Sequence, residues 1–75
     1  MKPAALDTMG DIYYQMGEPD AAIAKYEEAL QVKPDFSPSY KNISYLYALK
    51  EDYDKTRYWT DKWMKNVRSA GSVGE

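Results

Sequence analysis

The side chains that could carry out chemistry in this 75-residue chain are carboxylates, lysines and tyrosines, because the sequence contains no cysteine and no histidine. Disulfides, thiolate or imidazole metal sites, a cysteine nucleophile and a Ser–His pair are therefore excluded. Two acidic pairs occur, Glu27–Glu28 and Glu51–Asp52. Because neighbours in sequence diverge on a helix, we interpret both pairs as solvated surface. The sequence predicts a protein that is not an enzyme and that has neither a metal site nor a cofactor.

Charge is nearly balanced over the whole chain but not along it. Ten Lys and Arg residues stand against 12 Asp and Glu residues, a formal net charge of −2. Residues 1–36 hold three basic and seven acidic residues, a net of −4, whereas residues 37–75 hold seven basic and five acidic residues, a net of +2. Binding of nucleic acid needs a basic surface, and the acidic first half also disfavours an RNA-reading helical repeat. We predict no nucleic-acid partner. The opposite halves could steer head-to-tail self-association or orient a partner, or could be an ordinary solvated surface.

The length and hydropathy of the chain are those of one small domain. A chain of this size buries only about 60% of the surface that its unfolded form exposes, so its stability margin is thin. The longest apolar run is Tyr45–Leu49, far shorter than a membrane-spanning helix. No membrane partner is predicted, and no apolar run near the N-terminus would form a signal peptide. The compartment is unknown from the sequence, with the cytoplasm as the default expectation.

Breaks rich in proline and glycine separate the elements that must position the candidate side chains. They lie at Pro3, at Gly17–Asp20 and at Lys33–Pro38. Between the breaks, apolar residues recur three and four apart, which is the spacing of one helix face. The pattern predicts four antiparallel helices, over about 4–16, 20–32, 38–50 and 52–68, with Ser37 as the N-cap of the third. Residues 69–75 are small and polar and are predicted to form a flexible tail.

The proline-containing starts of the first and third predicted helices are separated by a period of about 34 residues. At this offset Tyr13 matches Tyr47 and Asp20 matches Asp54, and several further positions pair apolar with apolar residues. Identity alone does not prove a repeat, but the patterning supports one. Small residues, aromatic residues and a proline at fixed spacing make the first repeat resemble the tetratricopeptide repeat, at Leu6, Met9, Gly10, Tyr13, Ala22, Tyr26, Ala29 and Pro34.

The second repeat matches this pattern less closely. Its first helix keeps the apolar positions, but Trp63 stands where the family has alanine and Arg68 where it has proline. We interpret it as an atypical terminal repeat. The resemblance implies an all-α fold in which two tandem helix-turn-helix repeats form an α-solenoid of four antiparallel helices. Repeat one would cover about 3–36 and repeat two about 37–68, in a single domain of residues 1–68.

The resemblance also implies a function, because tetratricopeptide arrays bind proteins or peptides on the concave face, which the first helix of each repeat lines. The residues that it places on this face are Asp7, Asp11, Tyr14, Lys41, Asn42, Tyr45 and Leu49. Some members of the family clamp a C-terminal carboxylate with lysine and asparagine. Here Asp7 and Asp11 occupy the clamp positions of the first helix, so we reject that function. Two carboxylates instead favour a partner segment that carries lysine or arginine.

The last predicted helix provides a second candidate surface, made of Trp59, Trp63 and Met64. In a longer array a following helix would cover it, and three or more repeats are usually needed for stability. Either both tryptophans fold inward onto the preceding helices, or a homodimer covers them. The alternative to partner binding is therefore a structural or oligomerisation module, natural or engineered, that self-associates through its last helix.

Overall fold

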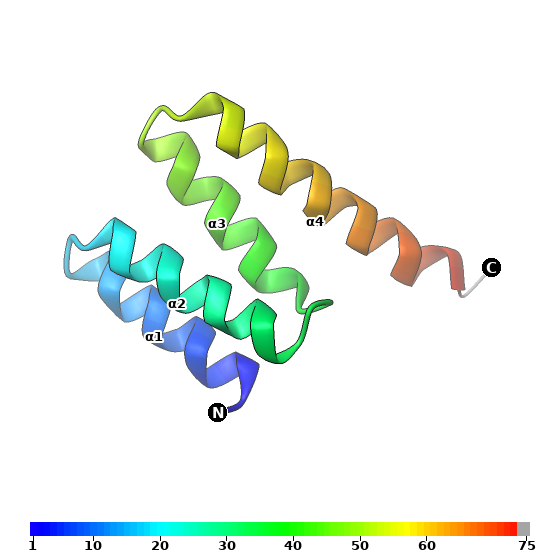
Figure 1. Ribbon diagram of the computed structural model, residues 1–75, viewed down its shortest axis with the longest axis horizontal. Helices are drawn as coiled ribbons and strands as arrows, with labels where there is room; N and C mark the ends of the chain where they lie inside the picture. The colour runs from blue at the N-terminus through cyan, green and yellow to red at the C-terminus, as the bar shows by residue number, and fades with distance from the viewer. Residues whose placement is uncertain (74–75) are drawn as a thin grey trace.

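Four α-helices make up the computed structural model, which describes residues 1–73 of the chain (Figure 1). They are α1 (Pro3–Gln15), α2 (Pro19–Val32), α3 (Ser37–Leu49) and α4 (Tyr53–Val73). The described residues contain no strand. The prediction of an all-α fold with four helices is confirmed, and the short connections place consecutive helices antiparallel (Figure 1).

The repeat period found in the sequence is visible in the helix boundaries. Helix α3 begins and ends one period after α1, and α4 begins one period after α2. Only the end of the second repeat differs. Pro34 follows α2 and blocks its continuation, whereas Arg68 stands one period later and presents no such block. Helix α4 therefore continues to Val73, so that the predicted tail of residues 69–75 begins inside the last helix. Residues 74–75 lie outside the described residues.

Proline in the first turn begins α1, α2 and α3, with no side-chain cap in any of them. The prediction of Ser37 as the N-cap of α3 was wrong, because Phe36 holds that position. The Ser37 hydroxyl instead accepts a hydrogen bond of 2.6 Å from the Asn66 amide of α4. That contact fixes the start of α3 to the neighbouring helix.

Helices α1 and α3 end in the same hydrogen-bonded motif. After α1, the N–H of Gly17 donates to the carbonyl of Tyr14 and the N–H of Glu18 donates to the carbonyl of Tyr13. This pair of hydrogen bonds defines a Schellman cap. The motif needs a left-handed residue, and Gly17 supplies it with φ of +80°. Glu51 holds the equivalent position after α3 with φ of +60°. A side chain in this conformation is strained, so the second repeat carries a cost that the first avoids.

The core lies between the two repeats and draws on α2 and α3. Its buried residues are Ala22, Ile23, Tyr26, Ile43 and Leu46, with Tyr13, Leu30, Tyr47 and Trp59 packed against them. Trp59 therefore points inward, 6.0 Å from the Tyr40 ring between centroids. Of the two alternatives considered for the tryptophans, inward packing onto the preceding helices describes Trp59.

Gly10 allows α1 and α2 to approach closely. It is buried, and a Cβ atom added to it would lie 2.7 Å from Cδ1 and 2.9 Å from Cζ of Tyr26. Only glycine leaves room for that ring.

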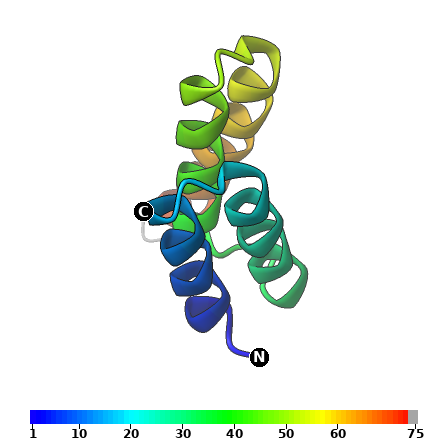
Figure 2. The ribbon, with the colours of Figure 1, turned by 90° about the vertical axis from the view of Figure 1, so that its left-hand side faces the viewer.

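The first helices of the two repeats lie on the same side of the molecule. Figure 2 shows α1 and α3 along one side and α2 along the other. No helix in the described part of the chain is long and apolar enough to cross a membrane.

Candidate partner-binding site

The face formed by α1 and α3 brings the sequence-predicted site residues together. Contacts cross between these helices at two levels, in their first halves and nearer their ends. Asp7 of α1 meets Asn42 of α3, and Tyr14 of α1 meets Tyr45 of α3. We call this surface the α1/α3 face, and its residues Asp7, Asp11, Tyr14, Lys41, Asn42, Tyr45 and Leu49 all belong to these two helices.

Asp7 joins the two repeats at this face. Its Oδ1 atom accepts hydrogen bonds from the Ser39 hydroxyl at 2.9 Å and from the Asn42 amide at 3.1 Å. Ser39 is fully buried, so the carboxylate satisfies a hydroxyl that water does not reach. Sequence reasoning did not identify Ser39. The repeat period could have indicated Ser39 as a neighbour of Asp7, because side chains about one repeat apart on the first helices of successive repeats lie side by side.

Asp11 is held from the other side, by α2. Its Oδ1 atom accepts a short hydrogen bond from the hydroxyl of the buried Tyr26. Burial and this bond to a carboxylate both raise the pKa of Tyr26. Both aspartates are thus engaged within the chain, but their donors are neutral. The two negative charges on the face are not cancelled.

Exposed aromatic and aliphatic side chains lie toward the ends of α1 and α3 on this face. Tyr14 is 40% exposed, Tyr45 55% and Leu49 53%. The two tyrosine rings meet edge to face, with 6.1 Å between centroids and an interplanar angle of 72°, the geometry that aromatic pairs prefer. The hydroxyl of Tyr45 beside that of Tyr14 raises the pKa of Tyr14. These three side chains, here called the tyrosine strip, offer apolar area with polar tips.

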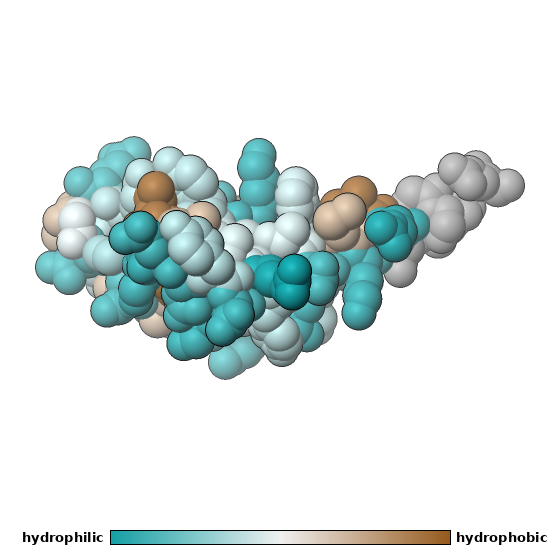
Figure 3. Space-filling model, turned by 90° about the horizontal axis from the view of Figure 1, so that it is seen from above, coloured by the Kyte–Doolittle hydropathy of each residue, from teal (hydrophilic) through white to brown (hydrophobic). Residues whose placement is uncertain are grey.

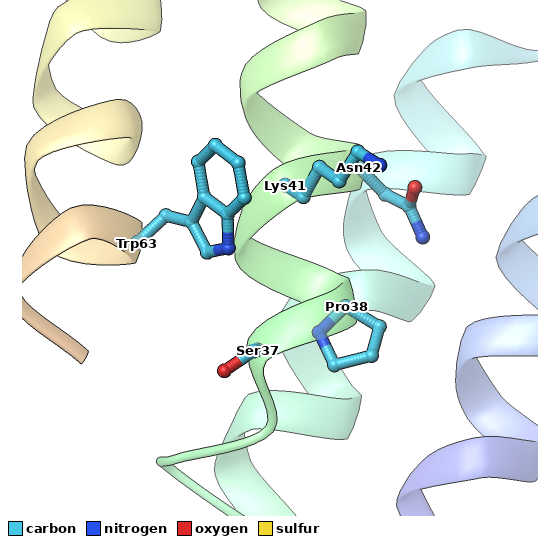
Figure 4. A pocket seen from close by; sticks show the side chains of 5 residues that line it. All are labelled: Ser37, Pro38, Lys41, Asn42 and Trp63. Atoms are coloured by element: carbon cyan, nitrogen blue, oxygen red, sulfur yellow. The ribbon is translucent and has the colours of Figure 1, made fainter. Parts of the chain in front are cut away.

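A groove of about 330 Å³ lies beside the strip, between the start of α3 and the middle of α4. It is lined by Ser37, Pro38, Lys41, Asn42 and Trp63. Figure 4 shows Trp63 reaching from α4 toward α3, with Lys41 and Asn42 on the α3 side. The sequence had left two alternatives for Trp63, packing onto the preceding helices or burial in a homodimer, because no pattern in the sequence shows where a long helix will place a ring.

Lys41 is the cation of this groove. The ion pairs formed within the described part of the chain join Lys25 to Glu28 and Lys50 to Asp20, and Lys41 takes part in neither. The face therefore carries negative charge on α1 and positive charge on α3. Among the described residues, no cluster of three or more acidic, histidine or cysteine side chains could hold a metal ion.

Comparison with known proteins agrees with this architecture. The family model of the TPR (tetratricopeptide) repeat matches residues 10–51, which include the end of α1, all of α2 and all of α3. Over 52 residues, or 68% of the chain, the sequence is 42% identical to a probable UDP-N-acetylglucosamine–peptide N-acetylglucosaminyltransferase, SEC, of Arabidopsis thaliana. The chain spans 5% of the length of that protein. The matched repeat, the regular period of the helix boundaries and the paired helices together show that this chain belongs to the TPR repeat family.

Proposed function

We propose that the chain is a non-catalytic interaction module that binds a segment of a partner protein on the α1/α3 face. TPR repeats generally mediate protein–protein interactions. The observation that carries the proposal is the tyrosine strip, Tyr14, Tyr45 and Leu49, which stays exposed beside the groove at Trp63. Tyrosine and tryptophan beside polar groups are typical of the residues that dominate binding energy at protein interfaces.

The charges of the face suggest the chemistry and the orientation of the partner. Asp7 and Asp11 favour a lysine or arginine of the segment near α1, and Lys41 favours an acidic group near the groove. An apolar side chain would cover the tyrosine strip, which lies toward the ends of α1 and α3. A segment that carries a basic, an apolar and an acidic residue therefore fits, and we propose it as the class of ligand.

Peptides selected from a random displayed library against the immobilised protein provide the probe. A selected peptide is synthesised with a fluorophore, and its affinity is measured by anisotropy for the protein and two variants. Tyr45→Ser removes the centre of the strip and should weaken binding about tenfold or more. Tyr58→Ser is the matched control, because Tyr58 is also 55% exposed but lies on α4. Equal affinities of the two variants would contradict the proposal.

A second pair of substitutions tests the charges. In Asp7→Asn with Asp11→Asn, each side chain keeps an oxygen that can accept the bonds from Ser39 and Tyr26 but loses its charge. We expect weaker binding to a basic peptide and a shallower dependence of affinity on salt. An unchanged salt dependence would show that the carboxylates serve only to hold the helices.

A further inference from the structure

The two ends of the helical stack both expose apolar surface. At the N-terminal end, an open hollow of about 290 Å³ is lined by Met9, Ile12 and Tyr13 of α1 and by Met16, which directly follows that helix. Ile12 is 52% exposed and Met16 65%. This surface is here called the α1 end face.

At the C-terminal end, α4 exposes a second apolar surface. Trp63, Met64, Val67 and Arg68 line a hollow that is also about 290 Å³. Met64 is 45% exposed and Val67 47%. Figure 3 shows apolar side chains gathered on the helix just before the grey C-terminal residues. We call this surface the α4 end face.

The repeat period relates each of these two faces to one side of the contact between α2 and α3 inside the chain. One repeat period after Met9 and Ile12 stand Ile43 and Leu46, which are buried in the core beside Ala22, Ile23 and Tyr26 of α2. The α1 end face is therefore the counterpart of the surface with which α3 packs on α2.

Helix α4 is in turn the counterpart of α2. One period after Leu30, which packs against the core, stands Met64 of the α4 end face. The core residues Ala22, Ile23 and Tyr26 of α2 correspond on α4 to Thr56, Arg57 and Thr60. The chain therefore repeats its inner α2–α3 contact in part at its two ends, and neither end is covered by another helix in the described structure.

Charge favours the same pairing. Residues 1–36 carry a formal net charge of −4 and residues 37–75 a net of +2. Bringing the first repeat of one molecule against the second repeat of another places opposite charges together, whereas pairing two α4 end faces places like charges together.

From these observations we propose that a second copy of the chain docks its α1 end face on the α4 end face of the first and continues the stack head to tail. In this intermolecular contact, α1 of the second copy packs on α4 of the first much as α3 packs on α2 within the chain. Trp63 replaces the buried Ala29, so the docked helix lies further out, and the hollow beside Trp63 receives an α1 side chain such as Ile12. A contact of this kind does not close on itself, and it produces chains of increasing length rather than a dimer.

Two variants block one end each. Ile12→Lys with Met16→Lys places positive charge on the α1 end face, which would meet the basic second repeat. Met64→Lys with Val67→Lys places positive charge on the α4 end face, opposite the apolar residues of the α1 end face, and in a mixture it also repels the lysines introduced in the first variant. Val32→Glu is the matched control, because Val32 is 51% exposed on α2 and belongs to neither face. Circular dichroism verifies that each protein is helical, and alanine replaces the charges in any variant that is not.

Sedimentation velocity from about 10 µM to about 1 mM covers the range of weak self-association. The unmodified chain and Val32→Glu should increase in mass with concentration and pass the dimer without a plateau. Each end variant should stay monomeric alone, and an equimolar mixture of the two should form a dimer and nothing larger. A monomer at the highest concentration would overturn the proposal. So would a dimer plateau that only the α4 variant abolishes, since that result would indicate two α4 end faces in contact.

Discussion

Gly10 and Tyr26 form a close contact between α1 and α2, and replacing Gly10 with alanine tests whether that contact determines the packing of the first repeat. The new Cβ would lie 2.7 Å from Cδ1 of the Tyr26 ring, so the ring or a helix must move. The ring has little freedom, because Tyr26 is 3% exposed and its hydroxyl is bonded to Asp11.

The magnitude follows from two destabilising terms and one stabilising term. Overpacking a core costs about 1–3 kcal/mol, and loss of the bond between Tyr26 and the charged Asp11 costs about 1.5–3 kcal/mol. Against these, alanine stabilises a helix by about 1 kcal/mol relative to glycine. We expect Gly10→Ala to lower the free energy of unfolding by about 1.5–5 kcal/mol, a large part of the roughly 4–11 kcal/mol available to a domain of this size.

The second repeat provides the control. One period later, Ser44 stands in place of Gly10 and Thr60 in place of Tyr26, so a Cβ is tolerated where the large ring is absent. In a Tyr26→Thr background, Gly10→Ala should therefore be neutral or stabilising by up to about 1 kcal/mol. Urea unfolding followed by circular dichroism measures all four proteins, with an osmolyte added to keep the two proteins that carry Tyr26→Thr folded. An equal effect of Gly10→Ala in both backgrounds would refute the reasoning.

Three further predictions concern stability. Glu51→Gly should stabilise the chain by about 1 kcal/mol and Gly17→Ala should destabilise it by a similar amount in urea unfolding, because both positions have positive φ. The raised pKa of Tyr26 means that the folded state keeps its proton while the unfolded state loses it above pH 10, so stability should fall as pH rises through that range. Tyr26→Phe should therefore reduce the rate at which the free energy of unfolding falls with pH, by at most about 1.4 kcal/mol per pH unit, in urea titrations between pH 8 and 11.5. Asp7→Ala should cost about 1–3 kcal/mol by leaving the buried hydroxyl of Ser39 without its acceptor, whereas Asp7→Asn should cost less; equal losses in thermal unfolding would contradict the role of Asp7.

Local sequence rules predicted the helices because each boundary depends on residues beside it. Proline in the first turn determines where α1, α2 and α3 begin, and the left-handed Gly17 determines where α1 ends. The exception has the same origin, since no proline follows the second repeat at Arg68 and α4 continues.

The site was predictable only in part, because its contacts join residues about one repeat apart. The resemblance to the family placed Tyr14 and Tyr45 on the first helices of the two repeats, but it could not show that their rings would meet. It also could not show that Asp7 and Asp11 would find donors in Ser39 and Tyr26. Such pairings depend on how α1, α2 and α3 are packed, which the pattern of a single helix does not contain.

The central claim is that the partner segment lies on the α1/α3 face, and amide chemical shifts measured by NMR test it most directly. The ¹⁵N-labelled protein is titrated with a peptide selected for binding. We predict that the largest shift changes map to Tyr14, Lys41, Tyr45 and Leu49, with little change along the α1 and α4 end faces. Changes concentrated at Met64 and Val67, with the tyrosine strip unaffected, would contradict the account.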